Sequence, residues 1–557
     1  MELVVVGLPG SGKTAVGKRV AARRGATFVD LDEQIEREAG VRIPDVFAAE
    51  GEAGFRRRER AAIEALGRAD DSDRLTRVVA PGGGAIVDPR NRWRLFRGRR
   101  VAWLDVRPEV VAQRLRRSPN VRPLVAGRDP LGAIRELVAS RGRFYAAGTR
   151  VGGVAELGTV VGAVDELLGT PASAGTVLLR AETRLGRLVI GEGVLASEVA
   201  TALGDLEARR AILVSEPGAW AAVGARLAED LARTGLPVER VMLPQGEDAK
   251  RLPVIEQAAR ALAQLRVERR EPLVAIGGGA LGDAAGFLAA TWLRGVPLIH
   301  VPTTLVAQID ASIGGKTGVD LPEGKNLVGA FHQAASIVID VSVLASLDVR
   351  QRRAALAEAL KMATLGDERL FATLEADGRA IAAGDAAASE SGAVAEVVER
   401  AAWAKVEVVL ADEHESAGRI ALNLGHSLGH AIEAAAGFGE LLHGEAVAYG
   451  LRAAARIGVA RGVTPADRAA RIERLLDQLE LGTMPLSVDL AAVLDTLGLD
   501  KKHAAGALRW VLPTDDGWAI DADVPEDLVQ EVAANVLAGR RSTSTRVAGA
   551  PVPAARS

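Results

Sequence analysis

A glycine-rich run near the start of the chain constrains its fold more than any other feature. Gly7-Leu8-Pro9-Gly10-Ser11-Gly12-Lys13-Thr14 follows an apolar, strand-like segment directly and precedes a helical pattern. In that context backbone N–H groups cradle phosphates, the lysine reaches the β- and γ-phosphates, and the Thr14 hydroxyl meets Mg²⁺. We therefore expect a nucleotide-binding parallel α/β domain. Its phosphate loop comprises Gly10, Ser11, Gly12, Lys13 and Thr14.

Length and composition limit the remaining possibilities. At about 100–200 residues per domain, 557 residues predict three or four domains. The absence of cysteine excludes disulfides and thiolate zinc sites, which leaves histidine and carboxylates as strong metal ligands. A net charge of −3, from 69 basic and 72 acidic residues, argues against a general nucleic-acid binder. No long apolar run or signal peptide is evident, so we expect a cytoplasmic protein without a membrane segment.

The patterning along the chain divides it into segments. Short apolar runs alternate with helical patterns up to about residue 170, and again from about 211 to 301. The stretch 169–175 is small, polar and helix-breaking, and from about 350 the pattern is almost wholly helical. We predict a P-loop domain with a parallel sheet (1–168), a linker (169–177), a Rossmann-like α/β domain (178–349), a mostly α-helical metal-binding domain (350–539) and a disordered tail (540–557).

Charged and glycine residues in the first domain indicate a small acidic acceptor. Asp30 and Asp32 end the second predicted strand, at the edge where ligands bind in open α/β sheets. Two aspartates at i and i+2 share a strand face, so one can reach a metal and the other a hydroxyl. Any single arginine among 60 in this chain is usually a solvated surface cation (69 Lys+Arg less nine Lys). The further motifs are Phe55-Arg56-Arg57, Gly82-Gly83-Gly84-Ala85, Val121-Arg122-Pro123-Leu124 and Ser140-Arg141.

Together these motifs resemble shikimate kinase over residues 1–168. The resemblance implies transfer of phosphate from ATP, with Mg²⁺, to shikimate. Asp30 would help hold Mg²⁺ through water, Asp32 would accept the proton of the attacking hydroxyl, and Arg122 would close over the transferring phosphoryl group. The sequence departs from the family after Tyr145, where small residues replace a basic stretch. The residues that would bind shikimate are Asp32, Arg56, Gly82, Gly83, Gly84 and Arg141.

The second α/β segment carries a weaker dinucleotide signal. A predicted strand enters the glycine turn Gly277–Asp283, and a later strand ends in Val301-Pro302-Thr303-Thr304. Glycines permit close approach of the backbone to a pyrophosphate, although the turn is not a strict G-x-G-x-x-G. A tight strand-to-helix turn without a ligand stays open as an alternative.

Histidines cluster in the helical segment. Four of the seven lie between His414 and His443, and His426 and His430 are placed at i and i+4 on one helical face. Glu358 could complete a three-ligand site with an open position, which is a catalytic zinc geometry. A lone histidine is usually structural, but the clustering favours a metal site.

Residues 178–535 resemble 3-dehydroquinate synthase through a long series of motifs. These motifs are Gly246–Lys250, Gly277–Asp283, Val301–Asp310, Gly314–Gly318, Gly324–Asn326, Asn423–His426 and His443–Ala446. The resemblance implies that NAD, with Zn²⁺ or Co²⁺, serves the conversion of 3-deoxy-D-arabino-heptulosonate 7-phosphate to 3-dehydroquinate and phosphate. NAD transiently oxidises a hydroxyl, phosphate is eliminated, and the cofactor is regenerated.

The same resemblance assigns residues to roles. Glu358, His426 and His443 would bind the metal. Glu415, His430, Lys361 and Lys405 would act in catalysis, with Glu415 as proton acceptor. NAD would contact Glu247, Lys250, Gly278, Gly279, Asp283, Thr303, Thr304, Lys325 and Asn326. The substrate would contact Asp310, Lys316, Lys361, Lys405, Arg419, Asn423, His430, Lys501 and Lys502, with Arg294 reaching in from a partner subunit.

These expectations add up to one bifunctional shikimate-pathway enzyme. We expect small-molecule substrates, no nucleic-acid or membrane partner, and a homodimer formed through the synthase half. One alternative is another small-molecule P-loop kinase fused to a metal-dependent polyol dehydrogenase. A neutral polyol, however, needs no cluster of cations for a phosphate. A second alternative is an inactive nucleotide-binding scaffold, which would be expected to have lost some of these residues.

Overall fold

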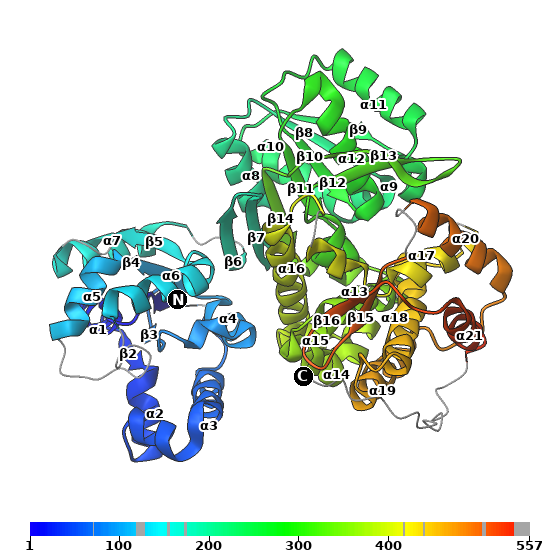
Figure 1. Cartoon of the computed structure of the whole chain (residues 1–557). Coiled ribbons are helices and arrows are strands. Elements are labelled where there is room, and N and C mark those ends of the chain that lie inside the picture. The colour runs from blue at the N-terminus through cyan, green and yellow to red at the C-terminus, as the bar shows by residue number, and fades with distance from the viewer. Residues whose placement is uncertain are drawn as a thin grey trace. The chain divides into compact units, whose positions relative to one another are not determined.

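The computed structural model describes residues 1–70, 72–117, 129–152, 156–171, 175–415, 418–437, 440–503 and 508–539 (Figure 1). The chain divides into two compact units. The first comprises Met1–Asp348 and Gly384–Leu410, and the second comprises Val349–Ala383 and Ala411–Ser557. The predicted lid residue Arg122, linker residues 172–174 and the tail from residue 540 lie outside the described residues.

The first unit begins with a five-stranded parallel sheet in the order β2-β3-β1-β4-β5. Its core is formed by buried aliphatic side chains of β1 and β4, of helix α1 and of helix α7. The second strand ends at Asp30, so the prediction that Asp32 lies on the same strand is wrong: Asp32 belongs to the first turn of the following helix, where its N–H donates to the Asp30 carboxylate. The strands are β1 (Glu2–Val6), β2 (Thr27–Asp30), β3 (Arg77–Ala80), β4 (Arg100–Asp105) and β5 (Thr149–Gly152).

Aspartates set the starts of three helices in this domain, including Asp129 at the helix that begins at Pro130. The Asp30 carboxylate accepts hydrogen bonds from the first turn of α2, and Asp88, followed by Pro89, caps α4 in the same way. The helix α3 bends at Gly51, whose φ is 67°. The helices are α1 (Lys13–Arg24), α2 (Leu31–Ala39), α3 (Ile43–Ala65), η1 (Ala85–Val87), α4 (Pro89–Phe96), α5 (Pro108–Arg117), α6 (Pro130–Tyr145) and α7 (Leu157–Gly169).

A seven-stranded sheet follows in the order β6-β7-β14-β11-β10-β8-β9. Strand β6 is antiparallel to β7, and all other neighbours are parallel. The strands β12 (Lys316–Leu321) and β13 (Gly324–Phe331) form a separate, two-stranded antiparallel sheet. The seven strands are β6 (Thr176–Thr183), β7 (Gly186–Glu192), β8 (Ala211–Ser215), β9 (Val238–Met242), β10 (Leu273–Gly277), β11 (Leu298–Pro302) and β14 (Ser336–Asp340).

The remaining helices of the first unit lie between and after these strands in the chain. The helices are α8 (Leu195–Asp205), α9 (Pro217–Ala219), η2 (Trp220–Gly224), α10 (Ala225–Arg233), η3 (Gly246–Ala249), α11 (Leu252–Gln264), α12 (Gly279–Thr291), η4 (Trp292–Arg294), η5 (Ala307–Ala311), η6 (Val341–Ser346), α15 (Ala386–Glu390) and α16 (Ala393–Ala411). Buried valine, leucine and isoleucine side chains from β8, β10, β11, α8 and α10 form the core around the seven-stranded sheet.

The second unit is mostly helical, as predicted. The sequence pattern did not reveal the short antiparallel hairpin of β15 (Trp510–Pro513) and β16 (Trp518–Asp521), because four-residue strands offer little alternation to detect. The helices are α13 (Val349–Thr364), α14 (Glu368–Ala383), η7 (Gly418–Asn423), α17 (His426–Ala435), α18 (His443–Ala460), α19 (Ala466–Gln478), α20 (Leu490–His503) and α21 (Glu526–Leu537).

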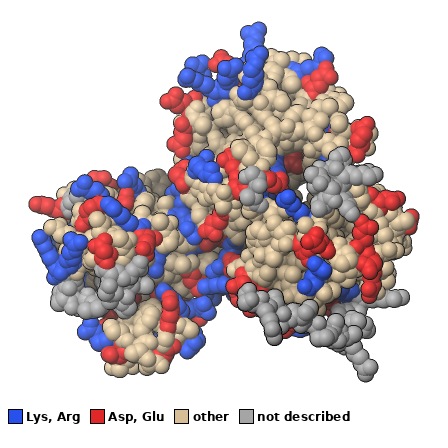
Figure 2. Space-filling model, viewed as in Figure 1, with Lys and Arg blue, Asp and Glu red and all other residues tan. Residues whose placement is uncertain are grey.

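Charge is mixed over the visible surface. Figure 2 shows basic and acidic side chains interspersed over most of this face, with a group of basic side chains at the outer end of the domain that holds the seven-stranded sheet. Among the described residues, no helix is both long and apolar enough to cross a bilayer.

The buried His300 of β11 makes the fold sensitive to acid. Burial, with the nearby His332, lowers the pKa of His300 from 6.5 to about 4. Between these values only the unfolded chain binds the proton, so stability falls as pH falls, by up to about 3 kcal/mol. His300→Asn is expected to reduce the loss of unfolding free energy between about pH 7 and pH 4.5, measured by urea denaturation. His414→Asn, at an exposed histidine, is the control. An undiminished loss in His300→Asn would contradict this origin of the acid sensitivity.

Candidate functional site

The phosphate loop joins β1 to α1 as the sequence predicts. Gly10 and Gly12 have φ of 81° and 100°, a region that favours glycine. The Lys13 ammonium donates to the carbonyls of Gly7 and Leu8, both at 3.1 Å. No side chain caps the N-terminus of α1, so its first N–H groups are available to phosphate oxygens. The loop can therefore hold a nucleotide polyphosphate.

A cation position lies beside the loop. The Thr14 hydroxyl donates to Oδ2 of Asp30 at 2.8 Å, while Oδ1 of Asp30 caps α2. A hydroxyl and a carboxylate next to a phosphate loop are oxygen ligands of the kind Mg²⁺ prefers. The donor set thus fits Mg²⁺ carried with a nucleotide.

The acceptor residues predicted from sequence surround one turn, Gly82–Gly84. A Cβ on Gly82 would lie 2.6 Å from Oδ1 of Asp32, and one on Gly84 would lie 3.0 Å from the Arg56 guanidinium. Arg141 of α6 donates to the Gly83 carbonyl at 3.0 Å. The space around the turn admits no side chain, and a carboxylate and two guanidinium groups border it.

Sequence reasoning missed a carboxylate that holds Arg56. Glu59, one helical turn further along α3, is 2% exposed and pairs with Arg56 at 2.8 Å. Burial raises the pKa of Glu59 above 4.5, although Arg56 offsets part of the effect. The i, i+3 spacing to Arg56 was the available signal. Glu59 fixes the direction in which Arg56 presents its charge.

Two further side chains hydrogen-bond to the backbone of the acceptor turn and of the phosphate loop. The Tyr145 hydroxyl donates to the Gly83 carbonyl at 2.8 Å, and burial raises the pKa of Tyr145 to about 12, so it stays a donor. Arg114 of α5, which sequence reasoning did not single out, donates to the Ser11 carbonyl at 3.3 Å. The third predicted cation, Arg122, lies outside the described residues.

In the second sheet domain, glycines again open a helix after a parallel strand. The helix α12 begins at Gly279, and no side chain caps it. A Cβ on Gly278 would lie 3.3 Å from the Thr304 methyl group, and one on Gly279 would lie 3.0 Å from Ala311. Thr303 is buried next to Thr304, and its N–H donates to the Gly277 carbonyl. This cradle of bare backbone fits a pyrophosphate.

Lys250 contacts three of the other residues predicted to bind NAD, namely Glu247, Asp283 and Asn326. It is 3% exposed and contacts Asp283 at 2.9 Å as well as the side-chain oxygen of Asn326. Burial alone would lower its pKa, but the surrounding carboxylates raise it, so Lys250 stays charged. Burial raises the pKa of Asp283 to about 6 despite this contact. Glu247 lies 3.4 Å from Lys325 at the edge of the cluster.

Glu216 performs a role that its sequence position did not reveal. Its buried carboxylate accepts from the N–H of Gly246 at 2.7 Å and from the N–H of Gly278 at 3.3 Å. The side chain therefore joins the two glycine turns that carry the predicted NAD residues. The sequence shows only that Ser215-Glu216 follows a strand.

The remaining predicted residues of the first unit lie on separate elements. Lys405 of α16 contacts Asp310 of η5 at 2.6 Å. Lys316 begins β12 and is exposed. Arg294 ends an exposed turn in which Leu293 and Arg294 have φ of 49° and 65°.

In the second unit, Glu358 of α13 meets the histidines of α17 and α18. Its Oε1 lies 3.5 Å from Nε2 of His426 and 3.2 Å from Nε2 of His443, and the residue is fully buried. Ligand atoms of His426, His430 and His443 lie within 4.8 Å of one another. The structure thus brings the three predicted ligands and His430 together. Three imidazoles and a buried carboxylate suit Zn²⁺ or Co²⁺.

The electrostatics of this cluster favour a cation. Burial raises the pKa of Glu358, but Lys361, at 2.5 Å, and the imidazoles hold it well below 4.5. Burial and the Lys361 charge lower the pKa of His426 to about 3, which leaves a neutral ring whose Nε2 faces Glu358. Burial also lowers the pKa of His443, but Glu358 and Glu433 outweigh it and raise the pKa to about 10. A divalent cation would supply the charge that a proton on His443 otherwise supplies.

Glu433 is a second residue that sequence reasoning missed. Its Oε2 lies 3.3 Å from Nδ1 of His443, on the far side of the ring from Glu358. Its spacing from His430 and His426 on α17, at i+3 and i+7, would have placed it on their face. A carboxylate at the second nitrogen fixes the ring and makes it a better ligand.

The predicted substrate residues of the second unit are distributed around η7. Arg419 is 2% exposed, and its guanidinium donates to the Glu413 carbonyl while its N–H donates to Asp412. Asn423 ends η7, and Glu415 adopts a left-handed φ of 59°. Lys501 and Lys502 belong to α20, and their side chains lie outside the described part.

Three family models match the chain, in agreement with these two kinds of site. The shikimate kinase model matches residues 9–151, the 3-dehydroquinate synthase N-terminal model matches residues 240–354, and the 3-dehydroquinate synthase C-terminal model matches residues 355–503. The two resemblances drawn from sequence motifs, and the fold class, are confirmed.

Relatives and solved structures agree with the family models. The 3-dehydroquinate synthase of Synechococcus sp. is 42% identical over 336 residues, which cover 59% of this chain and 89% of that protein. The structure of 2-epi-5-epi-valiolone synthase from Streptomyces hygroscopicus, with NAD⁺ and Zn²⁺ bound, is 28% identical with a TM-score of 0.58, over 66% of this chain and 99% of that one. A 2-deoxy-scyllo-inosose synthase complexed with carbaglucose-6-phosphate, NAD⁺ and Co²⁺ is 27% identical with a TM-score of 0.55, over 62% and 96%.

Glu433→Gln tests the support of the metal cluster. The variant keeps the side-chain size but removes the charge that His443 faces, so we expect about 10- to 100-fold weaker Zn²⁺ affinity, measured by competition with a chelator. Glu440→Gln, at an exposed carboxylate, is the matched control and should bind Zn²⁺ like the unaltered protein. Equal affinity in the two variants would contradict a role for Glu433 at the metal.

Proposed function

Because the chain belongs to the 3-dehydroquinate synthase family and also carries a shikimate kinase domain, we propose that its described sites perform both reactions. The N-terminal domain phosphorylates shikimate from ATP, and the remainder converts 3-deoxy-D-arabino-heptulosonate 7-phosphate to 3-dehydroquinate and phosphate. The observation that carries the proposal is that one chain holds both an acceptor turn bordered by Asp32, Arg56 and Arg141 and a buried Glu358 facing three imidazoles.

In the kinase half, the protein positions the acceptor and stabilises charge. Arg56 and Arg141 match a carboxylate with planar donors, and the glycine turn presents its backbone to the acceptor without side chains of its own. Asp32 accepts the hydrogen of the attacking hydroxyl, and the loop N–H groups with Lys13 stabilise charge on the phosphoryl oxygens. Arg122 is proposed, from the resemblance alone, to close over that group.

In the synthase half, the chain's side chains hold the substrate and move its protons. Lys361, Lys405 and Arg419 are buried cations that suit the phosphate and carboxylate of one small substrate. His430 and Glu415 are proposed to transfer protons. The proposed phosphate and carboxylate contacts further include Arg294 of a partner subunit, Asp310, Lys316, Asn423, Lys501 and Lys502.

Bound NAD supplies a hydride acceptor that later returns the hydride, and a bound Zn²⁺ or Co²⁺ polarises the hydroxyl that is oxidised. Glu358, His426 and His443 would hold the metal, and the neutral His426 and low pKa of Glu358 suit that role. The uncapped start of α12 and the Lys250 cluster would hold NAD.

A second substrate class needs its own test. The solved relatives are synthases named for other products, 2-epi-5-epi-valiolone and 2-deoxy-scyllo-inosose, and one holds carbaglucose-6-phosphate. The 42% identity to a 3-dehydroquinate synthase favours the seven-carbon acid phosphate. Phosphate release with glucose 6-phosphate in place of 3-deoxy-D-arabino-heptulosonate 7-phosphate would overturn that choice.

We further propose a cytoplasmic homodimer formed through the synthase half. The left-handed turn at Leu293 and Arg294 presents an exposed arginine in a fixed, unusual conformation, which suits a residue that serves a neighbouring subunit. Light scattering coupled to size-exclusion chromatography should give twice the chain mass, and a monomer would contradict the assembly.

A pair of variants separates the two activities. Lys13→Ala is expected to lower ATP-dependent phosphorylation of shikimate at least about a hundredfold, because the loop loses a positive charge at the phosphates. His426→Ala is expected to lower phosphate release from 3-deoxy-D-arabino-heptulosonate 7-phosphate by a similar factor, because the metal loses a ligand. Each variant should retain the other activity.

Matched controls are Lys18→Ala on the exposed side of α1 and His414→Ala, both expected to keep both activities. The assays measure shikimate 3-phosphate formation, and NAD- and metal-dependent phosphate release, on one folded preparation. If the unaltered protein with metal is silent in either assay, that half of the proposed function is wrong.

A further inference from the structure

The most completely buried cation of the kinase domain does not face the kinase pocket. Arg92 of α4 has no exposed surface, and its guanidinium stacks at 4.2 Å over the Phe144 ring of α6. Nη1 donates to the Ile86 carbonyl in η1, Nε donates to the Leu178 carbonyl of β6 at 2.8 Å, and Nη2 contacts the Glu399 carboxylate of α16. Two of these three partners belong to the synthase half.

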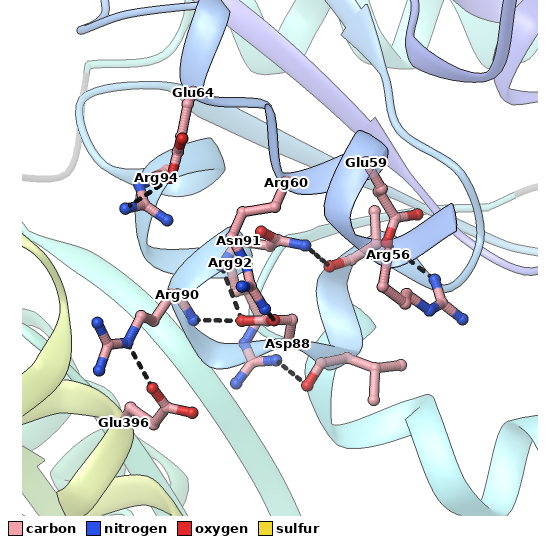
Figure 3. A network of polar contacts seen from close by, with 12 residues as sticks. Arg56, Glu59, Arg60, Glu64, Asp88, Arg90, Asn91, Arg92, Arg94 and Glu396 are labelled. Atoms are coloured by element: carbon pink, nitrogen blue, oxygen red, sulfur yellow. Dashed lines mark hydrogen bonds and ion pairs between the residues drawn. The ribbon is translucent and has the colours of Figure 1, made fainter. Parts of the chain in front are cut away.

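Neighbouring residues of α4 make the same connection. Arg90 contacts Glu396 at 2.6 Å, as Figure 3 shows, and Trp93 donates to the Glu390 carbonyl at 3.0 Å. Glu396 is 1% exposed. The helix α4 thus lies against α15 and α16 within the first unit. We call these contacts of α4 with residues 390–399 the α4 interface.

The α4 interface continues directly into the acceptor turn. The residues Gly82–Gly84 run into η1, where Arg92 holds the Ile86 carbonyl and Asn91 holds the Ala85 carbonyl at 3.2 Å. Asp88, which caps α4, also accepts from Arg60 of α3, the helix that carries Arg56 (Figure 3). Hydrogen bonds from α4 therefore fix the residues that follow the acceptor turn, and the contacts of Arg90 and Arg92 fix α4 to α16.

Helix α6 makes a parallel connection. Arg141 and Tyr145 hold the Gly83 carbonyl from one face of α6. Between them, Arg143 stacks at 4.2 Å over the Trp403 ring of α16. Both supports of the acceptor turn, α4 and α6, thus rest on the same synthase-half helix.

We propose that Arg92 is a positioning residue for the kinase acceptor site and that Glu399 of the synthase half completes its position. Glu399 orients the guanidinium so that its other donors hold η1 and the Gly82–Gly84 turn where Arg56 and Arg141 reach the acceptor. This inference rests on the proposed kinase function. It makes acceptor affinity depend on a residue that belongs, in sequence, to the other enzyme.

A purely structural role would give a different result. A buried ion pair is weak support for stability and is often replaceable by apolar side chains of similar volume. Replacing Arg92 and Glu399 together by apolar residues would satisfy a packing role, but it would still leave the Ile86 carbonyl without its donor. The stability and the affinity for shikimate therefore respond differently to the double variant.

The test uses the full chain and steady-state kinetics for both kinase substrates. Glu399→Gln is expected to raise the KM for shikimate about threefold or more, with the KM for ATP and kcat within about twofold. Arg92→Met/Glu399→Leu should fold, as judged by thermal denaturation, and raise the KM for shikimate about tenfold. Glu390→Gln is the matched control, because its exposed pair with Arg68 at 3.2 Å also joins the kinase domain to the synthase half but does not involve α4. It should leave both KM values unchanged.

Three outcomes decide the inference. An unchanged KM for shikimate in folded Glu399→Gln would overturn it, as would an equal rise in the KM for both substrates, which indicates general loosening. A double variant with unaltered kinetics would reduce the pair to packing. An unaltered protein without any shikimate phosphorylation would instead refute the proposed function, so the two failures are distinguishable.

Discussion

Both nucleotide-type sites depend on one constraint of helix ends. The first N–H groups of a helix have no partners within the helix, so they stay available wherever no side chain caps that end. In α1 and α12 the preceding residues are glycines and no side chain caps the helix, so those groups are available to phosphate oxygens. A serine or aspartate cap at either position would occupy the donors. The structure instead places aspartate caps at other helices, among them α2, α4 and α6.

The chain places many charges in its interior, and several of them are paired with an opposite charge. Glu358 faces Lys361 and two imidazoles, Lys250 faces Asp283, and Arg92 faces Glu399. An unpaired charge at any of these places would be costly, because a protein interior solvates ions poorly. Pairing therefore explains how these groups are tolerated in the interior, and it explains why removing one partner affects the other. The functional clusters are held by the same interactions that make their burial tolerable.

How far the sequence predicted the site depended on distance along the chain. The phosphate loop and the pair His426 and His430 are local, so spacing alone placed them on one loop or one helix face. Glu358 lies far from the histidines in sequence, so the residues alone offered it only as a candidate ligand, and the family resemblance assigned it, as it did Arg56 and Arg141. Glu59 and Glu433 were missed, although their helical spacing from Arg56 and His430 was visible. Glu216 and Glu399 could not be found in this way, because their partners are brought together only by the tertiary fold.

The helix α16 unites these observations. Glu399 on this helix contacts Arg92, which holds the kinase turn, and Trp403 stacks on Arg143 of α6. Two residues beyond Trp403, Lys405 contacts Asp310, a residue assigned to the synthase substrate. A helix transmits displacement along its length because its backbone hydrogen bonds resist local change. One helix therefore contacts residues that support the proposed kinase acceptor site and a residue assigned to the synthase substrate. The two halves of this chain are thus not independent domains joined only by a linker.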